Sequence, residues 1–124
     1  MTAFFPGRPE IDAYGNGGFR FAAMSHRGSI LALPSGIYGW NADPAALIPS
    51  DFDAMLAERR DIDLLLLGTG SIMRRPPLAV REAIAASAIM LDFMTTGAAV
   101  RTYNLLLAEK RKVAAALIAV EHAA

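Results

Sequence analysis

After Pro49 the chain alternates between strand-like and helix-like segments, and this order limits its possible folds more than any other feature. Residues 63–67 contain four consecutive leucines, which is typical of a strand buried on both faces. Further apolar strands are predicted at residues 89–93 and 112–120. Because a β-α-β-α-β order favours right-handed crossovers, the sequence predicts that these three strands run parallel to one another.

Helix start signals precede and separate these strands. Ser50, followed by acidic residues, resembles a capping box, and the Pro76-Pro77 pair suits a first helical turn. Thr95 or Thr96 suits the N-cap of the last helix. The predicted helices cover about residues 51–60, 76–87 and 95–109.

Before Pro49 the chain is rich in glycine and aromatic residues and poor in helix formers. Short strand-like stretches are separated by turn residues. This pattern predicts an antiparallel meander, and His26 lies in one of its turns. The predicted strands are residues 11–14, 19–24, 29–33 and 37–40, with a turn at 25–28.

The composition excludes several classes of protein. The chain of 124 residues suits one domain, over residues 1–124, and its hydrophobic content of 54% is enough for a core. Twelve basic and twelve acidic side chains cancel, so no net field attracts nucleic acid. The absence of cysteine excludes disulfides, zinc–thiolate sites and thiol nucleophiles. No apolar run approaches the ~20 residues of a spanning helix and no targeting signal is visible, so we expect a bacterial cytoplasmic protein without membrane insertion.

A first candidate loop follows the leucine-rich strand. Gly68, Thr69 and Gly70 lie where the carboxyl ends of strands bind ligands in α/β proteins, and glycine lets backbone N–H groups approach an anion. The pattern matches neither a dinucleotide fingerprint nor a P-loop. The alternative interpretation is a tight turn that leaves the strand.

A second candidate loop opens the last predicted helix. Thr95, Thr96 and Gly97 lie at its N-terminus, where unpaired N–H groups and the helix dipole favour an anion. Arg101 and Asn104 share a face of this helix and would complete the cradle. The alternative is an N-cap followed by small residues that let the helix pack closely on the sheet.

No arrangement of side chains indicates catalysis. His26 is the one histidine inside the predicted fold, no cluster has metal-ligand spacing, and no carboxylate pair is placed for acid–base work. We therefore expect no turnover, no metal and no redox cofactor. Aromatic and arginine side chains dominate interfaces, so the exposed members of Tyr38, Trp40, Arg74 and Arg75 are the predicted partner contacts.

Several segments resemble a family of small uncharacterised proteins with an Mth-type domain of unknown function. Its relatives include mitochondrial complex I assembly factor 3 and the adipogenesis-associated Mth-type domain protein. The resemblance covers about residues 9–120. The segments are residues 13–21 (AYGNGGFRF), 26–29 (HRGS), 67–70 (LGTG), 94–106 (MTTGAAVRTYNLL) and 111–117 (RKVAAAL).

The resemblance implies a mixed α/β fold of three layers, β/β/α, in which the antiparallel meander precedes the parallel β-α-β-α-β region. It implies no catalytic residue and no cofactor. The chain has Thr95 where the family pattern has aspartate, and Val100 where it has cysteine, so the chemistry of those groups is absent here.

Two hypotheses of function follow. The first is a non-enzymatic assembly or scaffolding factor for protein partners, similar to the relatives linked to complex I assembly. The second is a module or enzyme for a small anionic ligand, which uses the two candidate loops. The glycine-rich strands near Gly15 and Gly18 also offer an edge for a homodimer.

Overall fold

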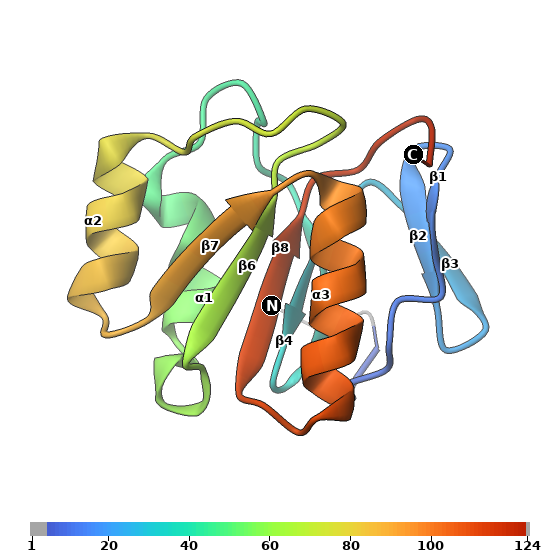
Figure 1. Cartoon of the computed structure of the whole chain (residues 1–124), viewed down its shortest axis with the longest axis horizontal. Helices are drawn as coiled ribbons and strands as arrows, with labels where there is room; N and C mark the ends of the chain where they lie inside the picture. The colour runs from blue at the N-terminus through green and yellow to red at the C-terminus, as the bar shows by residue number, and fades with distance from the viewer. Residues whose placement is uncertain (1–4, 124) are drawn as a thin grey trace.

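The computed structural model of this chain describes residues 5–123, and Figure 1 shows its elements. The strands are β1 (Ala13–Gly15), β2 (Gly18–Phe21), β3 (Met24–Arg27), β4 (Ser29–Leu33), β5 (Gly36–Trp40), β6 (Leu64–Gly68), β7 (Met90–Met94) and β8 (Val113–Leu117). The helices are α1 (Asp53–Leu56), α2 (Leu78–Ala86) and α3 (Thr96–Ala108), with short 3-10 helices η1 (Pro49–Phe52) and η2 (Arg59–Asp61).

The central sheet has five strands in the order β5-β4-β8-β6-β7. β6 runs parallel to both of its neighbours, with Leu66 opposite Asp92 of β7 and Ala115 of β8. This arrangement confirms the prediction that the three strands of the second half are parallel. β4 joins antiparallel to β8, with Leu31 opposite Ala116, so the last strand lies between the two halves of the chain.

The central sheet is covered on both faces, because successive leucines of β6 point to opposite sides. Leu65 and Leu67 pack in one apolar cluster with Ile84 of α2 and with residues of η1 and α1. Leu66 packs in a second cluster with Val100 of α3 and with the aromatic residues of β2. Figure 1 shows α3 and the small sheet of β1–β3 on one side of the central sheet. The structure therefore has the three layers that the resemblance implied.

The predicted meander is divided between two sheets. β1, β2 and β3 form a separate antiparallel sheet, in which Phe19 and Phe21 of β2 are buried toward the second cluster. β4 and β5 pair with each other as an antiparallel hairpin, but they belong to the central sheet.

The turn predicted at residues 25–28 is wrong. The hairpin between β2 and β3 turns at Ala22 and Ala23, whose φ angles are 50° and 60°. Two consecutive positive φ angles are typical of Asn-Gly turns, so two alanines give no turn signal in the sequence. Consequently His26 lies in strand β3, half-buried, with its ring against Gly39 of β5.

The two longer helices are confirmed. α2 begins after Pro77, and α3 begins after Thr95, whose Oγ1 accepts a hydrogen bond from the N–H of Ala98 at 3.4 Å. The helix predicted over residues 51–60 is wrong in form, because η1, a short α1 and η2 replace it. A tertiary contact fixes its first turn, since the indole Nε1 of Trp40 donates to the carbonyl oxygen of Asp51 at 2.8 Å.

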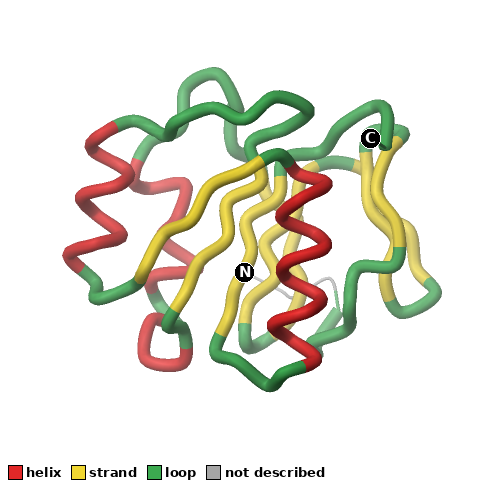
Figure 2. Tube along the Cα trace, viewed as in Figure 1, coloured by secondary structure: helices red, strands yellow, loops and turns green. Residues whose placement is uncertain are grey.

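Residues 5–12 form an irregular segment, which we call the N-terminal strap. Figure 2 shows this part of the chain as a loop that passes the lower end of α3 before it enters the small sheet. Phe5 pairs with Ile37 of β5 through two backbone hydrogen bonds of 3.1 and 2.8 Å. The side-chain amide of Asn104 on α3 accepts from the N–H of Ile11 at 2.8 Å and donates to its carbonyl oxygen at 2.9 Å. The strap is thus tied to both the central sheet and α3.

The strap also places the half-buried Arg8 near the buried Tyr103 of α3. Arg8 Nη2 donates to the carbonyl oxygen of Val113. Tyr103 of α3 is fully buried, and its hydroxyl makes no hydrogen bond within the described residues. Burial raises the pKa of Tyr103, and the positive charge of Arg8 offsets this rise only in part.

Candidate functional site

The two candidate loops lie side by side at the carboxyl ends of β6 and β7, as the sequence predicted. The N–H of Thr96 donates to the carbonyl oxygen of Gly70 at 2.9 Å, and the N–H of Gly70 donates to Thr96 Oγ1 at 3.0 Å. Thr96 Oγ1 in turn donates to the carbonyl oxygen of Ile118 at 2.7 Å. Because Thr96 is fully buried, its hydroxyl connects the two loops to the segment after β8.

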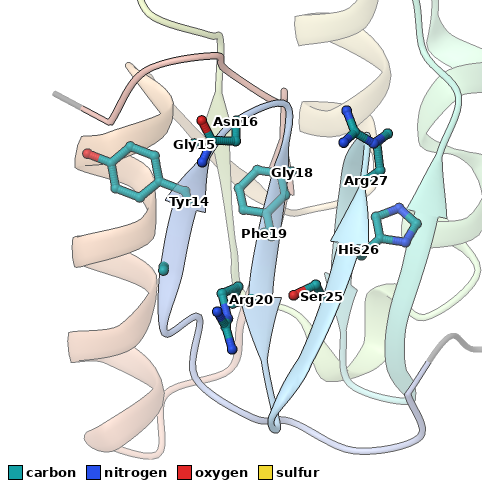
Figure 3. A pocket seen from close by; sticks show the side chains of 10 residues that line it. Tyr14, Gly15, Asn16, Gly18, Phe19, Arg20, Ser25, His26 and Arg27 are labelled. Atoms are coloured by element: carbon teal, nitrogen blue, oxygen red, sulfur yellow. The ribbon is translucent and has the colours of Figure 1, made fainter.

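Two glycines of these loops allow close packing. A Cβ atom on Gly68 would lie 2.9 Å from the Cα of Thr96. A Cβ atom on Gly97 would lie 2.4 Å from the hydroxyl oxygen of Tyr14, and Figure 3 shows that ring directed toward α3. The geometry around Gly68, Thr96 and Gly97 therefore matches the alternative interpretation, in which small residues let the helix and its neighbours approach.

Thr69 holds the first loop in a compact form. Its Oγ1 accepts from the N–H of Arg74 at 3.0 Å, and it lies 2.9 Å from the carbonyl oxygen of Ile72 and 3.1 Å from that of Met94. One threonine hydroxyl thus contacts the backbone of both Ile72 and Arg74 within the segment over residues 70–74. The backbone of this segment is fixed by these contacts although it lies at the surface.

The remaining residues of the predicted cradle are divided between two roles. Arg101 is exposed on α3. Asn104 is not available to a ligand, because both ends of its amide bond the backbone of Ile11. Its spacing to Arg101 predicted a ligand-binding role for Asn104, whereas the structure shows that Asn104 anchors the N-terminal strap.

The four residues predicted to contact a partner differ in their exposure. Trp40 is buried, at 9% exposure, and its ring packs edge-on against Phe52, so it is a core residue. Tyr38 is half-buried, and its hydroxyl lies 2.6 Å from Ser35 Oγ. Only Arg74 and Arg75 of this group are exposed.

Next to the first loop lies a hollow of about 450 Å³, at the carboxyl ends of β6 and β8. Its lining includes Pro44 and Ala45, and residues 69–72 with Arg74. Residues 118–122 form the rest of the lining. The lining includes Thr69 and Gly70 from the first candidate loop and none of the predicted residues of the second.

Large apolar side chains project beside this hollow, and they were not predicted from the sequence as site residues. Ile72 is 64% exposed and Met73 is 60% exposed, and both precede the exposed Arg74 and Arg75. We call Ile72, Met73, Arg74 and Arg75 the 72–75 loop. The sequence signal was present, since two apolar residues stand between a glycine-rich turn and an Arg-Arg-Pro-Pro segment, outside any predicted strand or helix.

Comparison with known proteins identifies the family. A family model described as a protein of unknown function (DUF498/DUF598) matches residues 11–118. The chain belongs to this family. The crystal structure of a Bartonella henselae protein, named an outer membrane protein, is 55% identical, covers 94% of this chain and 99% of its own, and has a TM-score of 0.91.

Two further relatives extend the comparison within and beyond the family. NADH dehydrogenase (ubiquinone) 1 alpha subcomplex assembly factor 3 from Homo sapiens is 31% identical over 110 residues, which are 87% of this chain and 59% of the human protein. The chain therefore spans about three fifths of that relative. The solution structure of an Mth938-like domain from Bordetella pertussis is 24% identical, covers 99% of this chain and 93% of its own, and has a TM-score of 0.80, which shows the shared fold.

The family resemblance inferred from the segments around Gly15, Gly68 and Gly97 is thus confirmed. Within residues 5–123, no group of three or more histidine, aspartate or glutamate side chains is placed to hold a metal ion. No helix in the same part of the chain is long and apolar enough to cross a membrane.

Proposed function

We propose that this protein is a non-enzymatic assembly or scaffolding factor that binds a protein partner through the 72–75 loop. The observation that carries the proposal is the exposure of Ile72 and Met73 on a backbone fixed by Thr69. Exposed apolar side chains on a fixed loop lose little conformational entropy on binding. Burial of one such side chain contributes about 1.5–3 kcal/mol, so this pair can provide much of the affinity for a partner.

The charge of the loop specifies the chemistry of the partner. Arg74 and Arg75 follow the apolar pair and are both exposed. Arginine is enriched among the residues that dominate interface energies. Its planar guanidinium can donate two parallel hydrogen bonds to one carboxylate. The proposed partner surface therefore combines an apolar recess for Ile72 and Met73 with acidic groups at its border.

The human relative supports the proposal, because its name describes an assembly factor of NADH dehydrogenase and this chain aligns with it over most of its own length. By this likeness, the partner is a subunit or a second assembly factor of a respiratory complex. We also propose a cytoplasmic location, with no membrane insertion and no nucleic acid bound.

The second candidate function is a module for a small anionic ligand, and the hollow beside Thr69 and Gly70 favours it. Its volume of about 450 Å³ is within the range of small-molecule sites. A screen of nucleotides, phosphate esters and organic acids by thermal shift tests it, because a ligand at 100 times its Kd stabilises the protein by about 2.7 kcal/mol.

The decisive experiment is affinity capture with a matched pair of variants. Ile72→Asp with Met73→Asp places charge in the proposed contact, whereas Leu105→Asp places a charge at a 60% exposed leucine on α3. We expect a partner that the wild type and Leu105→Asp retain and that the double variant loses, with all three folded by circular dichroism. A partner that survives the double variant, or turnover in an activity screen without any partner, would contradict the proposal.

A further inference from the structure

The outer face of the small sheet carries a second hollow, of about 420 Å³, which Figure 3 shows from close by. It is distant in sequence from the 72–75 loop and takes its lining only from residues 13–27. Phe19 and Phe21 of β2 are buried on the opposite face of the sheet, so the exposed Arg20 between them points outward. On β3, Ser25 and Arg27 are exposed in the same way.

Small residues make this face hollow. Ala13 lies opposite Arg20, and Gly15 lies opposite Gly18, so short positions surround the base of the long arginine side chain. Gly18 cannot be replaced without cost, because a Cβ atom there would lie 2.2 Å from the carbonyl oxygen of His26. β2 and β3 therefore approach closely at Gly18, and Gly15 and Gly18 line the floor of the hollow.

Two arginines border this floor. Arg20 is opposite Ser25 and Gly18 is opposite Arg27, so the arginines are diagonal neighbours on adjacent strands. Diagonal neighbours in an antiparallel pair lie about 7–8 Å apart. Figure 3 shows Arg20 and Arg27 toward opposite ends of the small sheet, with the hydroxyl of Ser25 on the same face.

The positive charge of this face is not neutralised by its own lining. No aspartate or glutamate belongs to the lining, whereas Arg20 and Arg27 do. Among the described residues, no hydrogen bond or ion pair of the Arg20 or Arg27 side chain is found. A Cβ atom on Gly17 would lie 3.4 Å from Glu121 Oε1 and 3.7 Å from Arg27 Nη1, so the carboxylate of Glu121 lies near the guanidinium of Arg27.

We propose that this hollow binds a small soluble molecule carrying a diphosphate group, with Arg20 and Arg27 each contacting one phosphoryl group. The planar guanidinium donates two parallel hydrogen bonds to phosphate oxygens, and two such groups match two linked phosphates. The exposed hydroxyl of Ser25 supplies a further polar contact. The volume of the hollow is within the range of small-ligand sites.

Calorimetry with inorganic pyrophosphate at low ionic strength tests the proposal. We expect saturable binding by the wild type, about tenfold weaker binding by Arg20→Ala and by Arg27→Ala, and no binding by the double variant. Arg20→Lys should also weaken binding, because the ammonium group of lysine does not present two parallel N–H donors as a guanidinium does. Arg111→Ala removes one exposed arginine from the opposite end of the chain and should bind as the wild type does.

Three results would overturn the proposal: no saturable binding by a folded wild type, an equal loss in Arg111→Ala, or unchanged binding in the double variant. A further arm replaces pyrophosphate with vesicles of phosphatidylglycerol and phosphatidylcholine. Binding to vesicles without binding to pyrophosphate would assign the arginines to a lipid surface and contradict a soluble ligand. The variant with Ile72→Asp and Met73→Asp should bind pyrophosphate normally, because the two sites are independent.

Discussion

The central sheet and the small sheet of β1–β3 are built on different principles. β6 and β8 are buried on both faces, and Leu65, Leu66 and Leu67 have no exposed surface. In the small sheet only one face is buried, by Phe19 and Phe21, and the other presents arginine and serine to solvent. A sheet buried on both faces is specified by continuous apolar sequence, whereas a sheet buried on one face depends on alternation and on its turns.

Because of this difference, the central sheet is suited to stabilise the fold and the small sheet to recognise other molecules. Continuous burial gives the central sheet most of the apolar contacts that stabilise the fold, but it leaves few polar groups for recognition. The small sheet has less to bury, and its exposed face is free to carry charged groups. The following predictions test whether the stability of the fold depends on the two sheets in this different way.

The largest expected effect is at the centre of β6. Leu66→Ala removes a fully buried side chain from the second apolar cluster, and we expect a loss of about 2–5 kcal/mol in the free energy of unfolding. Leu105→Ala, at an exposed leucine, should change it by less than about 0.5 kcal/mol. Urea unfolding of both variants measures the contrast, and equal effects would show that burial does not distinguish these positions.

A smaller and more local effect is expected from Gly18→Ala. The new methyl group would meet the carbonyl oxygen of His26, so β2 and β3 must separate, at a cost of about 1–3 kcal/mol. Hydrogen exchange should speed up at the amides of β1–β3 and stay slow in β6 and β8. Ser25→Ala, on the same outer face, is the control and should leave exchange unchanged. Faster exchange throughout the central sheet would contradict the separation of the two sheets.

The smallest effect at neutral pH is expected from Tyr103→Phe, in the layer where α3 meets the strap. The buried hydroxyl has no hydrogen-bond partner within the described residues, so its removal should be neutral or stabilise the fold by up to about 1 kcal/mol.

The same variant should reveal a pH dependence. Because the pKa of Tyr103 is raised in the folded state, the unfolded chain loses this proton first, near pH ~10. Wild-type stability is therefore unaffected by this group below that pH and falls as pH rises through it. Urea unfolding at neutral and alkaline pH should show a steeper alkaline loss in the wild type than in Tyr103→Phe. If the free energy of unfolding falls equally in the two proteins at alkaline pH, the ionisation of Tyr103 does not contribute to the loss of stability.

Much of the fold could be predicted, because its strongest signals are local. The four leucines of β6, the prolines before α2 and Thr95 before α3 each indicate their element from neighbouring residues alone. The division of the first half into two sheets could not be predicted in this way. It depends on Ala22 and Ala23 adopting positive φ and on β4 pairing with a strand about 85 residues later in the chain.

The candidate site was predicted in place but not in detail. The carboxyl ends of parallel strands correctly indicated where Gly70 and Thr96 would meet. Spacing alone could not show that Asn104 bonds Ile11 or that Trp40 enters the core, because both contacts join residues from separate parts of the chain. Ile72 and Met73 were not predicted, because the sequence alone does not show whether other residues bury an apolar pair.

The position of β8 between β4 and β6 determines when the protein can finish folding during its synthesis. Ribosomes release the chain from its first residue onward, at about 5–20 residues per second. The β4–β5 hairpin is therefore complete long before Val113–Leu117 emerges, and until then its inner edge and that of β6 have no partner. Closure of the sheet and docking of Arg8 against Val113 must wait until residues 113–117 have emerged from the ribosome. The nascent chain thus exposes two open strand edges until β8 arrives, and unpaired edges of this kind can pair with other chains.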